Sequence, residues 1–256
     1  MRKTFVVAAM LLIAAAAVQA DVGPITSFEG YANGTEVMFQ EPTYSGSTSG
    51  FMETTPNYSG VTDTKAHTGL ASYKASWQWK AGKINPWLRY TTYNTPNLPN
   101  PTISFTDKLG FWILFEPVEG GPTALKVGLG VRETNTTAAI GANGGGTGQV
   151  EILGVTGGVY NPIRTINVST EWQYVEFTLP TEPIVPLTGN GILESTTGKG
   201  VLESLAFAPI DASAVGPYTI YLDDFEVTPI PEPGSLLALG TGLVGLMGFA
   251  LRRRRV

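Results

Sequence analysis

The chain contains no cysteine and a single histidine, His67, among its 256 residues. The absence of cysteine excludes disulfide bonds and thiol catalysis, so an exported domain must be held together by its own core. No serine-histidine-aspartate order, zinc-binding helix signature or phosphate-binding loop occurs. The sequence does not exclude a pair of catalytic carboxylates like that of glycosidases, because the two residues of such a pair can be distant along a chain. The sequence therefore favours a non-catalytic protein over an enzyme.

Helical patterns are also missing. No amphipathic helix is indicated before residue 234, and no internal repeat of about 20–50 residues is present. Instead, 31 glycines and 18 prolines separate short runs rich in threonine, valine, isoleucine and aromatic residues. Such runs are typical of short strands joined by turns. We therefore predict an all-β fold, a two-sheet antiparallel jelly-roll sandwich with about ten strands.

Period-2 alternation is clearest in two segments. Over residues 70–80 one face carries alanine, tyrosine and tryptophan, and such a face is more often core than a sugar platform. Over 123–133 the leucines and valines point inward, and Gly128 and Gly130 leave the outer face hollow. The apolar segment 108–116 predicts a central strand.

Two neighbouring segments are assigned from their composition. Residues 87–93 are predicted as the hairpin partner of 70–80, after a turn at Asn85-Pro86. Residues 32–63 are polar and rich in turn signals. We therefore expect connections there rather than long strands.

Long hydrophobic runs are confined to the two ends of the chain. Residues 1–20 have a positive start and an apolar stretch, and end in a small-x-small site that predicts signal-peptide cleavage between Ala20 and Asp21. An uncleaved N-terminal anchor is the alternative. Residues 234–251 are uncharged and would span roughly 27 Å as a helix, close to the thickness of a bilayer core. A single transmembrane helix is therefore predicted there, with a buried core helix as the alternative.

The remaining boundaries follow from these ends. Residues 21–227 form the predicted ectodomain and 228–233 a proline-rich linker. Residues 252–256 form a cytoplasmic basic tail, because positive residues beside a short span are retained inside. Between the two hydrophobic ends the chain has about ten more acidic than basic residues. This balance argues against nucleic acid as a partner, since such binding needs a basic surface.

The C-terminal tail resembles the PEP-CTERM sorting signal. The resemblance is carried by Pro231, Glu232 and Pro233, by the apolar span and by four terminal arginines. Those arginines are Arg252, Arg253, Arg254 and Arg255. The resemblance implies an inner-membrane precursor that an exosortase-type membrane enzyme recognises and cuts near the motif. The product would then reside at the cell surface or outside the cell.

The ectodomain resembles carbohydrate-binding-module-like jelly rolls of the galactose-binding type. Three landmarks carry this resemblance: Phe28-Glu29-Gly30, the segment 67–73, and Tyr221-Leu222-Asp223-Asp224-Phe225. The family implies a structural calcium ion between the first and last strands. Its carried-over ligands are Glu29, Asp224, Asp223, His67 and Gly69. Calcium accepts such mixed oxygen ligands. Alternatively, the acids are solvated residues at strand ends.

Sugar binding needs exposed aromatic faces beside polar side chains. The candidates are Trp87, Tyr90, Tyr93, Trp112 and Arg132, with Arg89 and Lys126 nearby. The alternative is that most of these aromatic residues belong to the core. The leading interpretation is a non-catalytic exported protein of the envelope or extracellular matrix that binds polysaccharide. A purely structural surface protein and a glycan-active hydrolase or lyase are the alternatives.

Overall fold

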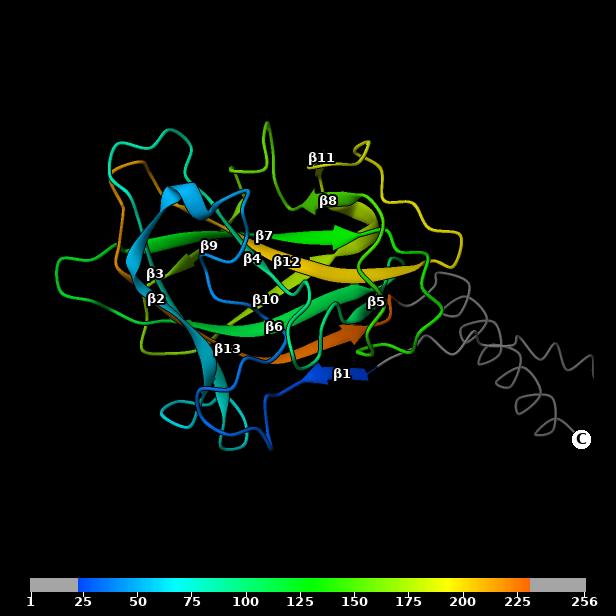
Figure 1. Cartoon of the computed structure of the whole chain (residues 1–256), viewed down its shortest axis with the longest axis horizontal. Coiled ribbons are helices and arrows are strands. Elements are labelled where there is room, and N and C mark those ends of the chain that lie inside the picture. Colours follow the sequence, from blue (N-terminus) through cyan, green and yellow to red (C-terminus); the bar gives the residue numbers. More distant parts are fainter. Residues whose placement is uncertain (1–22, 231–256) are drawn as a thin grey trace, which may run out of the picture.

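The computed structural model describes residues 23–230, which form two antiparallel sheets packed face to face (Figure 1). The six-stranded sheet contains β1 (Gly23–Thr26), β2 (Met52–Thr62), β3 (Ser72–Trp79), β6 (Lys108–Phe115), β10 (Gln173–Thr178) and β13 (Tyr218–Thr228). The seven-stranded sheet contains β4 (Leu88–Thr91), β5 (Thr102–Ser104), β7 (Ala124–Arg132), β8 (Val150–Leu153), β9 (Arg164–Asn167), β11 (Ile184–Pro186) and β12 (Lys199–Pro209). Two short 3-10 turns, η1 (Ser49–Phe51) and η2 (Leu179–Thr181), complete the described part. The predicted all-β, two-sheet jelly-roll sandwich is confirmed.

The strand order places late strands in the middle of both sheets. The first sheet runs β10-β6-β13-β3-β2, with β1 also pairing with β13. The second runs β11-β8-β7-β12-β4, with β5 on β12 and β9 on β7. Every pairing within these sheets is antiparallel. The last two strands of the chain, β12 and β13, therefore each lie between earlier strands.

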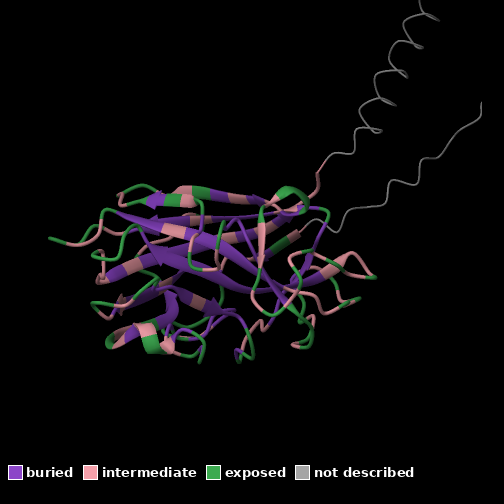
Figure 2. Cartoon of the chain, turned by 90° about the horizontal axis from the view of Figure 1, so that it is seen from above, coloured by how far each residue is buried: buried purple, intermediate pink, exposed green. Residues whose placement is uncertain are grey.

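The core between the sheets is aromatic. Trp77 on β3 stacks on Tyr218 of β13 and on Phe207 of β12, with ring centroids 5.4 Å apart in each pair. Tyr73 and Trp79 on the same face of β3 are also fully buried. The prediction that this face is core is confirmed, and Figure 2 shows the buried ribbons enclosed by more exposed loops.

The alternation of β7 is also confirmed. Its four inward residues belong to the main core: Leu125, Val127, Leu129 and Val131. The opposite face of β7 looks out from the seven-stranded sheet. As expected, β6 is an internal strand, between β10 and β13.

Two assignments are corrected by the strand pairing. Residues 88–91 do not form a hairpin with β3, because β4 pairs with β12 in the other sheet. The neighbour of β3 that precedes it in the chain is β2, which occupies residues 52–62 of the segment expected to be mainly turns. The composition of β2 did not indicate a strand, because several of its residues are polar and face solvent.

Two bulges interrupt the inner strands. In β12 the register shifts between Leu202 and Ser204, and in β13 it shifts between Asp223 and Glu226. A bulge inserts a residue, so that the side chains beyond it change parity. Leu202 and Leu205 both enter the core even though three positions separate them. The β12 bulge carries Glu203, and the β13 bulge begins at Asp223 and includes Asp224.

Several predictions concern residues outside those that the structure describes. They are the signal peptide 1–20 with cleavage at Ala20 and Asp21, the Pro231-Glu232-Pro233 motif, the span 234–251 and the basic tail 252–256. Within residues 23–230, no helix has the length and apolar character needed to cross a bilayer.

Candidate functional site: a cleft on the outer face of the seven-stranded sheet

An open cleft of about 420 Å³ lies on the outer face of the seven-stranded sheet. Its floor comes from β4, β7 and β12, and its walls come from loops. The lining residues are Tyr44, Ser45, Gly46, Arg89, Thr91, Tyr93, Arg132, Gly146 and Glu203. The volume is in the range usual for small-molecule sites.

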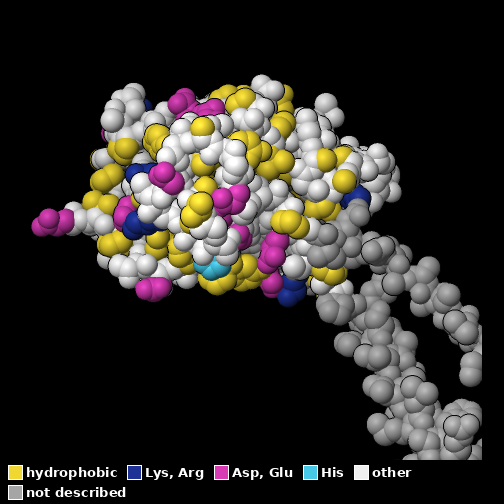
Figure 3. All heavy atoms as spheres, turned by 90° about the horizontal axis from the view of Figure 1, so that it is seen from below, with side chains coloured by type: hydrophobic (Ala, Val, Ile, Leu, Met, Phe, Trp, Pro, Cys, Tyr) yellow, Lys and Arg dark blue, Asp and Glu magenta, His cyan; other side chains and the backbone are white. Residues whose placement is uncertain are grey.

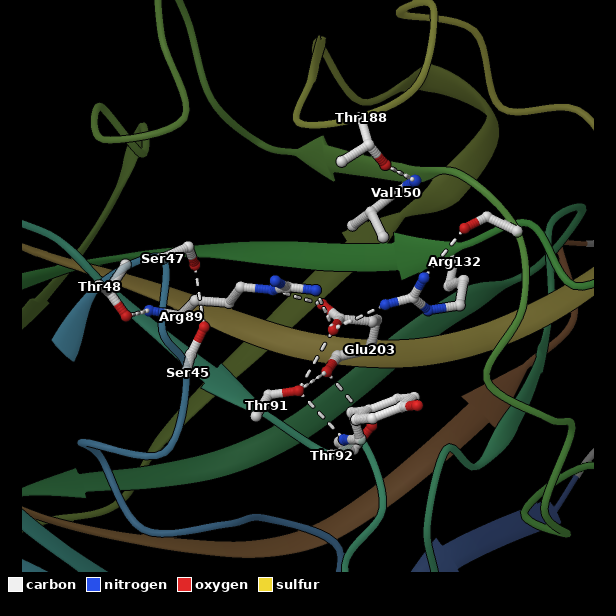
Figure 4. A network of polar contacts seen from close by, with 12 residues as sticks. Ser45, Ser47, Thr48, Arg89, Thr91, Thr92, Arg132, Val150, Thr188 and Glu203 are labelled. Carbon is white, nitrogen blue, oxygen red and sulfur yellow. Dashed lines mark hydrogen bonds and ion pairs between the residues drawn. The ribbon is translucent and has the colours of Figure 1, made fainter.

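Glu203 on the β12 bulge is the centre of the cleft floor, and its side chain is fully buried. Arg89 on β4 donates from Nε to Glu203 Oε2 at 3.1 Å and from Nη2 to Glu203 Oε1. Thr91 Oγ1 donates to the same Oε1 atom at 3.2 Å. Figure 4 shows the two arginines approaching Glu203 from opposite sides. A buried carboxylate is tolerated here because the two-pronged guanidinium contact compensates its desolvation.

Arg132 at the end of β7 is held less completely. Its Nη2 donates to Glu203 Oε1 at 3.3 Å and its Nη1 to the carbonyl of Gly148 at 2.9 Å. Its Nε is buried and has no hydrogen-bond partner. The guanidinium also lies 5.7 Å from the centre of the Tyr93 ring. The cleft therefore pairs one well-compensated cation with one that has spare donor capacity.

Two tyrosines line the cleft with exposed rings. Tyr44 and Tyr93 are each 42% exposed. The Tyr93 ring lies against the backbone of Gly146, where a Cβ atom would come within 2.6 Å of a ring carbon. The Gly146 backbone thus supports the Tyr93 ring, which stays partly exposed. Exposed aromatic faces of this kind suit stacking against a flat apolar surface.

Two glycines, Gly128 and Gly130, hold the outward positions in the middle of β7. A side chain at Gly130 would collide with the Ser204 side chain on the neighbouring strand. The outer face of β7 therefore carries no side chain between Lys126 and Arg132, because Gly128 and Gly130 hold the outward positions while Leu129 and Val131 point inward. Neither glycine lines the cleft. The space outside Gly128 is occupied by Val155 and Pro162, and that outside Gly130 by Ser204, so the hollow predicted from these glycines is filled by neighbouring side chains.

The structure brings together only some of the residues predicted for sugar binding. Tyr93 and Arg132 line the cleft, and so does Arg89. Tyr90 is a correction: it is fully buried and stacks on Phe39 at 4.6 Å, because alternation along β4 gives the outer face to Arg89 and Thr91.

The two tryptophans predicted for sugar binding lie outside the cleft. Trp87 is 6% exposed and packs in a small apolar cluster with Ala206 and Ala208 on the outer side of the same sheet. Trp112 belongs to the other sheet, where it stacks on His67 at 3.8 Å. Neither tryptophan lines the cleft.

Sequence reasoning missed Glu203 and Tyr44. A signal for Glu203 exists, because Leu202-Glu203-Ser204-Leu205 breaks the period-2 alternation with two polar residues between two apolar ones. In a strand such a break indicates a bulge, and bulges often re-aim functional side chains. Tyr44 lies in a polar loop between β1 and β2, and nothing in its surrounding sequence points to the cleft.

The residues predicted to hold calcium come together around the loop 65–71. Glu29 Oε1 accepts hydrogen bonds from the backbone N–H groups of Leu70 and Ala71, both at 2.8 Å. Asp223 Oδ2 accepts from the N–H of His67 at 2.8 Å, and Asp224 Oδ2 lies 2.7 Å from His67 Nδ1. The segment that follows β1 and the strand β13 are thus both tied to this loop. The observed ties are direct hydrogen bonds.

Asp223 is fully buried in this network. Burial, with a contribution from the neighbouring Asp224 charge, raises its pKa to about 6, even though backbone N–H groups pull the pKa in the opposite direction. Within residues 23–230, no group of three or more histidine or acidic side chains is arranged to hold a metal ion. Backbone carbonyl ligands are a separate matter, and calcium at Glu29, His67, Gly69, Asp223 and Asp224 stays a prediction.

The outer face of the six-stranded sheet has an aromatic surface of its own. Tyr174 on β10 lies over Gly110 of β6, donates to Glu226 at 3.1 Å and packs 5.2 Å from Trp112. Tyrosine over a cross-strand glycine covers exposed backbone, which is a structural role. Seen from below, this side of the domain shows hydrophobic and acidic side chains next to one another (Figure 3).

Comparisons with known proteins bear on the tail and on the fold. Residues 229–255 match the family described as the PEP-CTERM protein-sorting motif. The predicted sorting signal is therefore present in this chain, which marks it as an exported protein handled at the membrane. No curated protein matches the chain in sequence.

Several solved carbohydrate-binding modules are similar to the chain over most of its length. A family 30 module of a cellulosomal cellulase of Clostridium thermocellum is 14% identical, with 82% of this chain and 99% of that chain covered and a TM-score of 0.42. A family 11 module of another cellulosomal cellulase of that organism is 14% identical, with 82% and 96% covered and a TM-score of 0.45. The xylan-binding domain CBM22-1 of Paenibacillus barcinonensis is 14% identical, with 82% and 97% covered and a TM-score of 0.35.

Proposed function

We propose that this exported protein binds polysaccharide, without cleaving it, through the cleft between Tyr44, Tyr93 and the Glu203 network. The observation that carries the proposal is the combination of two exposed tyrosine rings with a fixed polar floor. A pyranose presents an apolar face that stacks on an aromatic ring and hydroxyl groups that need oriented donors and acceptors. The cleft supplies both.

The chemistry of the floor supports binding over hydrolysis. A glycosidase places two carboxyl groups about 5–9.5 Å apart across the scissile bond. Among the described residues, the cleft is lined by one carboxylate, Glu203, which two arginines and a threonine engage. Both of its oxygens already accept hydrogen bonds from these side chains. The cleft therefore lacks the paired acid and base that hydrolysis needs.

Sorting completes the proposal. The tail matches the PEP-CTERM motif, and we infer that an exosortase-type membrane enzyme processes it. The ectodomain would then act at the cell surface or in the extracellular matrix. Ten basic and nineteen acidic residues within 23–230 fit a soluble exported domain that avoids nucleic acid.

The test is retention of the purified full chain, kept in mild detergent, on a panel of polysaccharides that includes the polymer secreted by the producing cells. Tyr93→Ala should weaken retention about tenfold or more, because it removes a stacking face. Tyr58→Ala is the matched control, since Tyr58 is 40% exposed on β2 of the other sheet.

Three outcomes speak against the proposal. If the wild-type chain is retained on none of the polysaccharides, the result would favour a purely structural surface protein. Release of reducing ends from any polymer would favour a hydrolase or lyase. Equal retention of the Tyr93→Ala and wild-type chains would place binding outside the cleft.

A further inference from the structure

We propose that the cleft selects an acidic sugar, a uronic acid unit whose carboxylate pairs with Arg132. This inference rests on the proposed carbohydrate binding and names the class of sugar. It concerns a single charged unit within a glycan rather than a continuous polyanion.

The charge inside the cleft is opposite to that of the domain. Its charged lining residues are Arg89, Arg132 and Glu203, which give two cations and one anion. Over residues 23–230, acidic residues outnumber basic ones by nineteen to ten. A local excess of positive charge in an acidic domain favours a ligand with one negative group there, while the surrounding field disfavours many.

The spare charge belongs to Arg132. Arg89 contacts both carboxylate oxygens of Glu203, so these two charges largely compensate each other. Arg132 reaches only one of these oxygens, at 3.3 Å, and its other hydrogen bond goes to the uncharged carbonyl of Gly148. Its Nε has no partner, and its side chain is only 14% exposed.

A partly desolvated guanidinium with an unused N–H group gains more from a carboxylate than from a hydroxyl. Hydrogen bonds to ionised acceptors are shorter and about twice as strong as those between neutral groups. Glu203 already accepts from Arg89, Thr91 and Nη2 of Arg132, so it does not supply the further acceptor. Each Nη atom of Arg132 carries two N–H groups and uses one of them in the hydrogen bonds above, so a carboxylate brought by the ligand would accept from the remaining Nη groups.

Tyr93 makes the ligand a sugar acid rather than a small anion. Its exposed ring is beside the Arg132 guanidinium, 5.7 Å from ring centre to the guanidinium carbon. A stacking face next to a cation matches a uronate, in which a pyranose ring bears a carboxylate directly. An isolated inorganic anion would use the arginine and leave the tyrosine without a role.

The experiment uses three pairs of disaccharides that contain glucuronate, galacturonate or mannuronate, each with its carboxyl-reduced counterpart. Within a pair only the carboxylate differs. Binding to the full chain in detergent is measured by calorimetry. We expect at least one acidic disaccharide to bind about tenfold or more tightly than its reduced form. Arg132→Gln should abolish this difference, and Arg132→Lys should keep part of it.

The outcomes separate this inference from the function on which it rests. If every reduced disaccharide binds as tightly as its acidic form or more tightly, the inference is overturned and carbohydrate binding stays intact. The same holds if the chain binds none of the disaccharides but is retained on neutral polysaccharides. A preference that survives in folded Arg132→Gln also overturns it. If Arg132→Gln fails to fold, Arg132→Lys decides, since loss of the two-pronged geometry should still reduce the preference. A chain that binds no carbohydrate at all refutes the proposed function itself.

Discussion

Gly130 on β7 lies directly opposite Ser204 on β12, and the space that a side chain at position 130 would need is filled by the Ser204 hydroxyl. Gly130→Ala should therefore destabilise the domain by about 1–3 kcal/mol, as overpacking usually does. It should also weaken polysaccharide binding, because relief of the clash displaces the neighbouring Glu203. Urea unfolding and polysaccharide retention measure the two effects.

A double-mutant cycle controls this prediction. Ser204→Gly alone removes a hydroxyl that has no hydrogen-bond partner. Combined with Gly130→Ala it should recover most of the lost stability, because the added methyl group then has room. Additive effects of the two substitutions would show that the collision is not the cause.

Glu203 should be among the most costly polar residues to remove. Glu203→Ala leaves two arginines, each less than one fifth exposed, without their carboxylate. Breaking a buried ion pair in this way costs about 3–5 kcal/mol. Glu176→Ala breaks the Lys108–Glu176 pair, whose side chains are about one third exposed, and should cost less than about 1 kcal/mol. Similar losses in urea unfolding for both variants would contradict the buried network.

These contrasts show what the sequence could and could not predict. Period-2 patterns gave the strands β3 and β7 and the inward side of each, because burial of one face is a local property. Pairing was less accessible, since β4 binds β12 more than one hundred residues later. The register of β4 then decided that Arg89 lines the cleft and Tyr90 does not.

Only some of the residues that line the cleft could be predicted from the sequence. Tyr93 and Arg132 were predicted from the sequence as candidates for sugar binding, and both line the cleft. Glu203 depends on a bulge, and Tyr44 depends on where a loop of the first part of the chain lies in space. The bulge shows in the sequence only as a break in the alternation, and the position of the loop leaves no periodic pattern.

Asp223 should give folding stability a distinctive pH dependence. Its pKa is about 6 in the folded domain against an ordinary value of 3.8, so the folded state binds its proton more tightly. This contribution is complete below about pH 4 and is lost as pH rises through about 6. In chelator, the unfolding free energy of the wild-type chain relative to Asp223→Asn should fall by about 1–3 kcal/mol over that interval. Parallel curves for the two proteins would contradict the assignment.

Removal of divalent cation tests the calcium prediction. If calcium bridges the loop 65–71 to the first and last strands, chelation should lower the thermal midpoint by about 5–10 °C. Calcium, but not magnesium, should restore the midpoint, and Glu29→Gln should be insensitive to both treatments. An unchanged midpoint in chelator would leave the direct hydrogen bonds of Glu29, Asp223 and Asp224 as the whole connection.

The sorting motif has a separate test in the producing cells. Replacement of Pro231, Glu232 and Pro233 by alanine should leave the full-length chain in the inner membrane, because the processing enzyme would lose its recognition element. Fractionation and immunoblotting measure this. Thr228→Ala serves as the neighbouring control, because Thr228 lies just before the matched segment 229–255 whereas Pro229 lies within it. Normal release of a shortened product from the triple variant would contradict the assignment.

The position of β13 has a mechanical consequence. The matched sorting segment begins at residue 229, immediately after β13 ends at Thr228. β13 lies inside its sheet, with β6 on one side and β3 and β1 on the other. A pull applied at residue 228 must therefore shear several hydrogen-bond ladders together, whereas a tether on an edge strand could be peeled away bond by bond. A domain held at this end while its cleft grips a polymer would carry the tension through the middle of the sandwich.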